Sequence, residues 1–171
     1  MKITVALVSI FALVSCSMVE KVFNKKEKVF IKVTLQEHQK YCGGAAPTPE
    51  QQKGTFKPLA NQVYYFKNRI DQDLTKAKTD ASGLVNLKIE PGNYQVFMAD
   101  KIDLDFEKFY EKYQRNQENY ENESEACFRT YYSLPTWEVE IKNDSTFTLT
   151  EEIGCYTGSN PCVKYTGPAR P

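Results

Sequence analysis

Short segments in which apolar and polar side chains alternate recur along the chain, and a period of two is the pattern of a β-strand with one buried face. Segments with this alternation, or with other strand character, number seven and cover residues 29–35, 63–66, 74–79, 84–89, 94–98, 137–141 and 147–153. Turn dipeptides separate some of them, among them Ser82-Gly83 and Pro91-Gly92. About seven short strands joined by tight turns predict a mainly β fold, a two-sheet antiparallel sandwich of the immunoglobulin-like type.

Two stretches around these segments carry further predictions. Residues 137–141 and 147–153 flank the turn Asn143-Asp144, which predicts a hairpin of two neighbouring strands. Residues 37–57 contain Cys42-Gly43-Gly44 and Pro47-Thr48-Pro49. They therefore predict a long loop held by a disulfide at Cys42 rather than regular structure.

One stretch, residues 101–126, follows helical spacing instead. Apolar side chains recur there at Ile102, Phe106, Phe109, Tyr113 and Tyr120. This spacing predicts one helix over 103–120, capped at its N-terminus by Asp103 and inserted between two strands. Core packing is the common use of such a stripe, and the alternative is a surface for a partner protein or a glycan. For that alternative we name Phe109, Tyr110 and Tyr113 as the binding residues, beside the proline-containing loops around Pro47 and Pro161.

The N-terminal residues predict export. A short positive start, Met1-Lys2, precedes an apolar run over 3–14. The run is shorter than the roughly 20 residues of a membrane-spanning helix and fits the apolar region of a secretory signal peptide. The junction Leu13-Val14-Ser15-Cys16 resembles the lipobox of bacterial lipoproteins. That resemblance implies that Cys16 carries the lipid and becomes the first mature residue; the alternative is an ordinary signal peptide with a chance cysteine.

These features divide the chain into three parts. We expect a lipoprotein signal peptide over 1–15, a lipidated Cys16 with its tether over 16–28, and one β-sandwich domain with the helical insertion over 29–171. The implied location is the bacterial cell envelope, as an outer membrane lipoprotein that faces the periplasm, because the segment after Cys16 has no acidic cluster. The 22 basic residues balance 22 acidic ones, which argues against a nucleic-acid partner. The expected partners are the membrane, through the lipid anchor, and an envelope protein or glycan.

Four cysteines follow Cys16, namely Cys42, Cys127, Cys155 and Cys162. An even number in an exported domain predicts two disulfides, for which three connectivities exist. We favour Cys42 with Cys162 and Cys127 with Cys155, because Cys42 and Cys162 both lie in loops and would tie the early loop to the tail. A zinc site formed by the thiols and His38 is the alternative, and it lacks a Cys-x-x-Cys pair.

Three phrases in the first half resemble a known family. They are Lys57-Pro58-Leu59-Ala60-Asn61-Gln62-Val63, Thr79-Asp80-Ala81-Ser82-Gly83 and Ile89-Glu90-Pro91-Gly92-Asn93-Tyr94-Gln95-Val96. Together they resemble the carboxypeptidase regulatory-like, or transthyretin-like, β-sandwich domain over about residues 29–98. The resemblance implies a fold rather than an activity, since such domains serve as accessory, spacer and binding modules.

Candidate chemistry adds little to this picture. His38 is the single histidine, no nucleophile has an evident base, and no pair of carboxylates stands out. Neither Asp100, Asp103 and Asp105 nor Asp71, Asp73 and Asp80 have the spacing of a calcium loop. We therefore predict no catalytic residues, no metal and no cofactor. The function that follows is a lipid-anchored accessory or binding module that is not an enzyme; the alternatives are a glycan- or cell-wall-active hydrolase with unassigned carboxylates, and a structural spacer.

Overall fold

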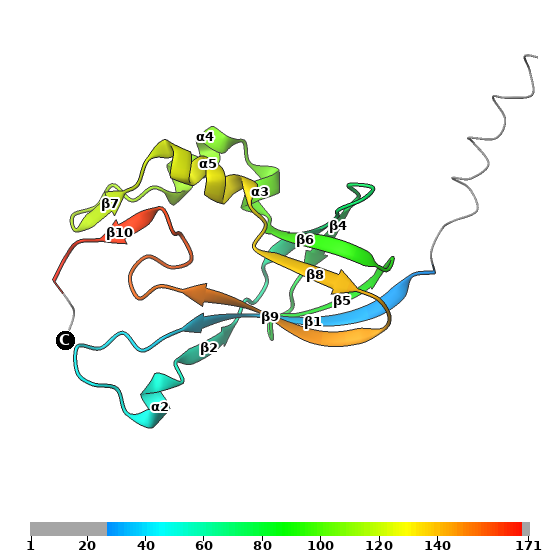
Figure 1. Ribbon diagram of the computed structural model, residues 1–171, viewed down its shortest axis with the longest axis horizontal. Coiled ribbons are helices and arrows are strands. Elements are labelled where there is room, and N and C mark those ends of the chain that lie inside the picture. The colour runs from blue at the N-terminus through cyan, green and yellow to red at the C-terminus, as the bar shows by residue number, and fades with distance from the viewer. Residues whose placement is uncertain (1–26, 169–171) are drawn as a thin grey trace, which may run out of the picture.

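A computed structural model describes residues 27–168, and over this range the chain is mainly β, as predicted (Figure 1). The strands are β1 (Val29–Gln39), β2 (Thr55–Pro58), β3 (Val63–Asn68), β4 (Leu74–Lys78), β5 (Leu84–Ile89), β6 (Gly92–Met98), β7 (Tyr120–Asn122), β8 (Trp137–Ile141), β9 (Ser145–Ile153) and β10 (Val163–Tyr165). The helices are α2 (Pro49–Gln52), α3 (Asp100–Asp103), α4 (Phe106–Tyr113) and α5 (Glu125–Ser133). The described residues thus form ten strands and four helices, where the sequence predicted about seven strands and one helix.

Two four-stranded sheets make up most of the fold. In the first, here called sheet A, β1 pairs antiparallel with β5 and β2 and parallel with β9. In the second, sheet B, the strand order is β4-β3-β6-β8 and every pairing is antiparallel. The long β1 pairs with two strands, because its residues 29–34 pair with β5 and its residues 36–39 pair with β2. The parallel pairing of β1 with β9 departs from the fully antiparallel arrangement that the sequence predicted.

One hydrophobic core joins the two sheets, and the inward positions of the alternating segments form it. Sheet A contributes Ile31, Val33, Leu35, Val85, Ile89 and Leu149, and sheet B contributes Tyr64, Phe66, Ala77, Tyr94, Val96 and Ile141. Val33, Leu35, Phe66 and Val96 have no exposed surface. The predicted strand faces are therefore the buried ones, and their burial is the main stabilising contribution to this layer.

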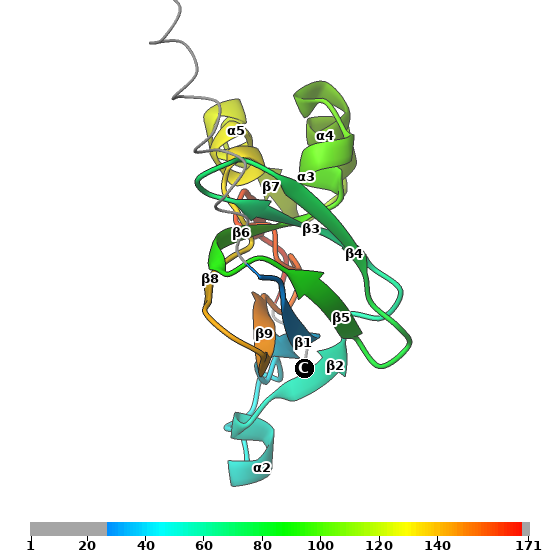
Figure 2. The same ribbon diagram turned by 90° about the vertical axis from the view of Figure 1, so that its right-hand side faces the viewer.

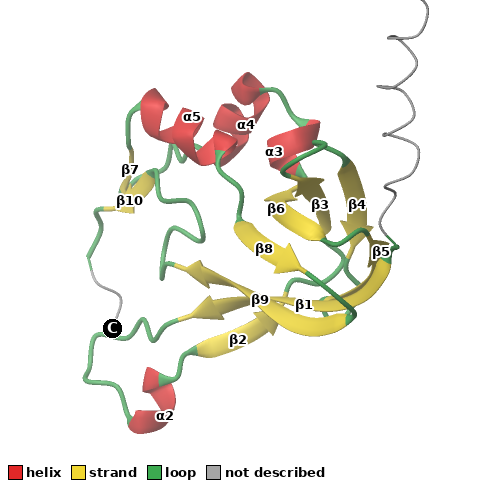
Figure 3. Cartoon of the chain, turned by 45° about the vertical axis from the view of Figure 1, so that its right-hand side comes forward, coloured by secondary structure: helices red, strands yellow, loops and turns green. Residues whose placement is uncertain are grey.

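The predicted hairpin of β8 and β9 is wrong, although both strands exist. β8 pairs with β6 at the edge of sheet B, whereas β9 pairs with β1 in sheet A. The turn around Asn143 and Asp144 therefore carries the chain from one sheet to the other (Figure 3). Trp137 bonds across this connection, since its Nε1 donates to the Thr150 carbonyl at 2.9 Å. Both strands have an apolar face to bury. They bury these faces in the core between the two sheets, each from its own sheet, and they do not pair with each other.

Helices α3, α4 and α5 gather at the opposite end of the molecule from α2 (Figures 1 and 2). Together with the short pair β7 and β10 they form a unit that we call the cap. The cap has a second hydrophobic cluster of its own around Phe128, Cys162 and Val163. The chain therefore has two cores, one between the sheets and one in the cap.

The single helix predicted over 103–120 is wrong in its extent. Asp103 ends α3, and Asp105 is the N-cap of α4, where its carboxylate accepts from the Lys108 backbone N–H at 2.9 Å. The helix ends at Tyr113, and Asn119 adopts a positive φ of 68° just before β7. The aromatic spacing continues past the helix because Tyr120 packs in the cap core from β7.

The segment predicted as an irregular loop over 37–57 is more ordered than expected. β1 continues to Gln39, and α2 begins after Thr48, whose hydroxyl accepts from the Gln51 N–H in a capping box. β2 then returns along β1 and places Phe56 opposite His38. The prediction of a disulfide at Cys42 is confirmed.

Candidate functional site

The inner face of sheet A changes character near the ends of β1 and β9. In their parallel pairing Leu35 lies opposite Leu149, and Glu37 lies opposite Glu151. Side chains two residues apart on a strand point to the same face, so the two glutamates follow the two buried leucines on the inward side. Two carboxylates thus lie on neighbouring strands where the apolar core ends.

The cap places charged groups against the same end of the sheets. Asp100, at the start of α3, accepts a hydrogen bond from the Tyr113 hydroxyl at 2.8 Å and pairs with Lys112 Nζ at 2.5 Å. Tyr113 and Lys112 both lie in the last turn of α4. These contacts connect α3 with α4, and both are made to the same oxygen of Asp100, Oδ2.

Lys101, the next residue of α3, is buried, with 5% of its surface exposed. Its Nζ donates to the Leu134 carbonyl at 2.9 Å and lies 3.9 Å from the centre of the Tyr131 ring. Burial lowers the pKa of Lys101 to about 8, against the attraction of Glu151, which raises it. The ammonium group is therefore held by a carbonyl and an aromatic face, with no carboxylate among its salt-bridge partners in the described chain.

Glu151 and Tyr64 face each other across this region. Burial raises the pKa of Glu151; a hydrogen bond from Ser159 and the charge of Lys101 lower it, and the charge of Glu37 raises it further. Tyr64 is 3% exposed, and burial together with Glu151 and Glu37 raises the pKa of its hydroxyl. Within residues 27–168 that hydroxyl makes no hydrogen bond to another side chain or to the backbone, and it is not among the enclosed unpaired atoms, of which Thr136 Oγ1 is the single case in this range.

A cleft of about 220 Å³ opens where the sheets meet the cap, and we call it the junction cleft. Its polar lining residues are Gln62, Tyr64, Asp100, Lys112, Tyr113 and Glu151, and its apolar lining residues are Leu59, Val63, Met98 and Ala99. Such a combination of apolar surface, a few converging polar groups and groups with shifted pKa is typical of a ligand site. The junction cleft is the candidate site of this protein.

The structure places the three predicted binding residues in the cap. Phe109 has no exposed surface, and its ring lies 4.3 Å from that of Tyr113 and 5.0 Å from that of Tyr132. Tyr110 packs edge-on against Phe128 at 4.9 Å. The stripe is therefore core packing, which was the commoner interpretation, and Phe109 is not part of any surface. Tyr113 alone of the three lines the cleft.

The predicted disulfide pairing is wrong. The bonds join Cys42 to Cys155 and Cys127 to Cys162. Cys42 and Cys155 follow the ends of β1 and β9, which run parallel with Gln39 opposite Ile153, so the two chains leave the sheet side by side. Cys127 lies in α5 just after β7, and Cys162 lies just before β10, the partner of β7. The pairing follows these two strand pairings, and neither is evident from the spacing of the cysteines.

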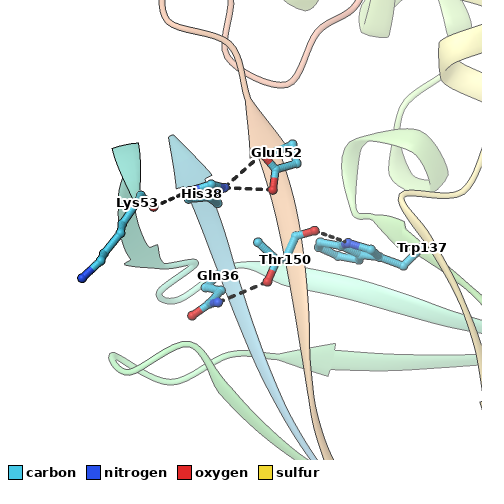
Figure 4. A network of polar contacts seen from close by, with 6 residues as sticks. All are labelled: Gln36, His38, Lys53, Trp137, Thr150 and Glu152. Carbon is cyan, nitrogen blue, oxygen red and sulfur yellow. Dashed lines mark hydrogen bonds and ion pairs between the residues drawn. The ribbon is translucent and has the colours of Figure 1, made fainter. Parts of the chain in front are cut away.

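His38 lies in a network on the outer side of β1, outside the cleft (Figure 4). Its Nδ1 lies 2.9 Å from Glu152 Oε1, its Nε2 lies 3.0 Å from the Lys53 carbonyl, and its ring stacks on Phe56 at 4.3 Å. Both partners are acceptors, so both ring nitrogens must donate, which requires the charged imidazolium. The hydrogen bond to Glu152 is the main cause that raises the pKa of His38. This histidine fastens the segment between α2 and β2 to β9.

Two further observations bear on the predicted chemistry. No group of three or more His, Cys, Asp and Glu side chains suited to a metal ion occurs within residues 27–168. Over the same residues no helix is both long and apolar enough to cross a membrane. The predicted signal peptide and Cys16 lie outside the described residues.

Sequence reasoning missed Glu37, Tyr64, Lys101 and Glu151. The available signal was the alternation itself, because Leu35-Gln36-Glu37 and Leu149-Thr150-Glu151 each place a glutamate at an inward position. A scan against protein-family models finds no match for the chain, and a search of curated proteins finds no relative. Function is therefore inferred from the residues of this chain.

Proposed function

We propose that this protein is a lipid-anchored binding module of the bacterial cell envelope, without catalytic activity of its own, that takes a small ligand into the junction cleft. The observation that carries the proposal is the hydroxyl of Tyr64, a cleft-lining residue that is 3% exposed: this hydroxyl makes no hydrogen bond among the described residues. It is accessible from the cleft, since Thr136 Oγ1 is the single enclosed side-chain oxygen or nitrogen without a partner in residues 27–168. A ligand that hydrogen-bonds to the Tyr64 hydroxyl replaces water there, and such a bond contributes about 0.5–1.5 kcal/mol net.

Two features support the envelope location. The apolar run over 3–14 and the lipobox-like Leu13-Val14-Ser15-Cys16 support export and lipid attachment at Cys16. The two disulfides support an oxidising compartment, because disulfides persist outside the cytosol. We place the protein on the outer membrane, facing the periplasm.

We further propose that the two sheets form a transthyretin-like sandwich related to the carboxypeptidase regulatory-like domains. Two motif positions support this. Gly83 has a φ of +76°, which the turn of the Thr-Asp-x-x-Gly phrase requires. Tyr94 is 3% exposed, and its hydroxyl donates to the Glu90 carbonyl at 2.7 Å around the Pro91-Gly92 turn. Such domains serve as binding and accessory modules, in line with the proposed function.

The ligand site is tested by thermal shift with the full chain purified in detergent. The probes are panels of small amines, neutral sugars and carboxylic acids. Ala99→Phe fills the cleft, and Ala45→Phe adds the same ring to an exposed loop as the control. We expect one panel to raise the unfolding midpoint of the wild type and of Ala45→Phe, but not of Ala99→Phe. A shift of equal size in Ala99→Phe, or none with any panel, would overturn the proposal.

The anchor is tested by the intact mass of the mature protein recovered from membranes. We expect chain 16–171 with acyl groups on Cys16, and loss of the membrane-bound form in Cys16→Ser. An unmodified Cys16 in the wild type would contradict the lipid anchor and would not affect the proposal of a ligand site in the junction cleft.

A second candidate, a hydrolase that acts on glycans, has one observation in its favour. Glu37 and Glu151 lie on strands that are about 4.8 Å apart in any sheet, close to the roughly 5–5.5 Å between the carboxyl groups of retaining glycosidases. Turnover of cell-wall polysaccharides by the wild type, lost in Glu151→Gln, would establish this activity. We favour binding because the 220 Å³ cleft accommodates about seven waters and no more than one small ring.

A further inference from the structure

The charged groups around the junction cleft do not balance. Two carboxylates, those of Asp100 and Glu151, and one ammonium group, that of Lys112, line it. Outside the lining, the charge of Glu37 raises the pKa of Glu151 and that of Lys101 lowers it, so a third carboxylate and a second ammonium group act on the site. The difference, three minus two, leaves one negative charge in excess.

The two ammonium groups are also unevenly placed. Lys112 is engaged with Asp100, which accepts from Tyr113 as well. Lys101 is directed to the Leu134 carbonyl and the Tyr131 ring, so its charge reaches Glu151 only from a distance. The excess charge therefore belongs to Glu37 and Glu151 on the sheet side of the cleft.

A carboxylate that is partly buried without an adjacent cation is unfavourable, because burial penalises its charged form. The raised pKa of Glu151 expresses this cost. The Tyr64 hydroxyl beside it offers an oxygen that accepts an N–H, and it lacks a partner among residues 27–168. The groups present thus match a ligand that brings one positive charge and donors.

We infer that the junction cleft selects a small primary ammonium ion. This inference rests on the proposed function and names the ligand class for the same site. The ammonium group lies between Glu151 and Tyr64 and donates its N–H groups to them, and the short apolar part of the ligand contacts Leu59 and Met98 in the same cleft.

Two other ligand classes fit less well. An anion would meet the excess negative charge of Glu37 and Glu151, while both lysines already have partners. A neutral sugar needs an open aromatic face on which to stack, but Tyr64 is buried and Tyr113 is stacked on Phe109 at 4.3 Å. Charge and available surface both favour the cation.

The test is isothermal titration of the full chain in detergent with four probes: ethanolamine, choline, propan-1-ol and glucose. Propan-1-ol has the shape of ethanolamine without its charge, so this pair separates charge from size. We expect ethanolamine to bind at least about tenfold more tightly than propan-1-ol, the difference typical of a charged partner. Choline has the charge without an N–H donor and is expected to bind more weakly than ethanolamine, and glucose is expected not to bind.

Three variants accompany the titration. Glu151→Gln is expected to weaken ammonium binding by about tenfold or more. Glu140→Gln, an exposed glutamate on β8, removes the same charge and serves as the matched control without effect. Lys112→Gln, an exposed residue, is expected to strengthen ammonium binding by about twofold, because it increases the excess negative charge. The opposite sign of this change tests the inference even if Glu151→Gln does not fold.

The outcomes separate the inference from the proposed function. Equal binding of ethanolamine and propan-1-ol, or binding of glucose alone, would overturn the ammonium ligand and leave a binding cleft. Weaker ammonium binding in Lys112→Gln would overturn it as well. No binding of any probe, together with no shift from any panel of the thermal experiment, would overturn both.

Discussion

The disulfide between Cys42 and Cys155 closes a loop of 113 residues, the longer of the two in the chain. It joins the ends of β1 and β9, where the only parallel pairing among the described strands runs out. Replacing both cysteines by alanine frees these ends in the unfolded chain and leaves the two cores untouched. We therefore expect a large loss of stability with little change in the folded structure.

The loss follows from the loop length. The chain-entropy relation gives about 16 cal/mol/K for 113 residues, or about 4.8 kcal/mol at 25 °C. The same relation gives about 3.8 kcal/mol for the 35 residues that Cys127 and Cys162 close. With a urea m-value of about 2 kcal/mol/M, the first loss lowers the unfolding midpoint by about 2.4 M.

The assay is urea unfolding followed by the fluorescence of Trp137, the single tryptophan, which lies 5.6 Å from the Tyr64 ring in the shared core. The double variant Cys127→Ala/Cys162→Ala is measured beside it, and peptide mapping without reduction checks the wild-type bonds. A midpoint lowered by less than about 0.5 M in Cys42→Ala/Cys155→Ala would refute the reasoning from loop length. A mapped bond between Cys42 and Cys162 would refute the pairing itself.

Three further predictions concern stability and are measured by the same urea unfolding. Phe109→Ala is expected to lower the free energy of unfolding by about 3–5 kcal/mol, because it empties a fully buried position of the cap. The control Phe30→Ala, at a 61% exposed position, should change it by less than about 0.5 kcal/mol. Equal losses in the two variants would contradict the cap core. Gly83→Ala should lower the free energy of unfolding clearly more than Gly158→Ala. Both glycines have a positive φ, but a Cβ at Gly83 would lie 2.4 Å from the Leu35 carbonyl oxygen, whereas a Cβ at Gly158 would have no atom within 4 Å. The raised pKa of His38 means that its ion pair stabilises the protein fully below its ordinary pKa of about 6.5 and less as the pH rises through the raised value. The advantage of the wild type over His38→Gln should therefore be larger at about pH 5.5 than at about pH 8.5, and an equal advantage at both would show that the ring is not charged.

The alternation of side chains was sufficient to place most strands. Six of the seven predicted segments begin and end within two residues of β3, β4, β5, β6, β8 and β9. The inward side chains were also predictable, since Val85 and Tyr94 are each 3% exposed, as the period of two requires. The strands that were missed, β2, β7 and β10, have three or four residues, too few for a period to show.

The local sequence pattern did not locate the ends of the helices correctly. Asp103 and Asp105 are both good capping residues, and only the turn between them shows that the second one caps α4. The aromatic spacing did indicate a buried stripe, yet it did not separate a helix from the strand that follows. Phe109 and Tyr120 share the cap although they belong to different elements.

The sequence by itself determined where the seven longer strands lie, which of their side chains face inward and that the cysteines form disulfides. Only the tertiary structure decided that β9 pairs with β1 instead of β8, that Cys42 pairs with Cys155, and that Glu37 and Glu151 meet Tyr64 at the cap. The physical reason is that any two strands form the same kind of backbone hydrogen bonds, so these bonds do not select one partner over another. The partner of a strand is chosen by how the buried faces pack in three dimensions, and residues distant in the chain meet only after that choice.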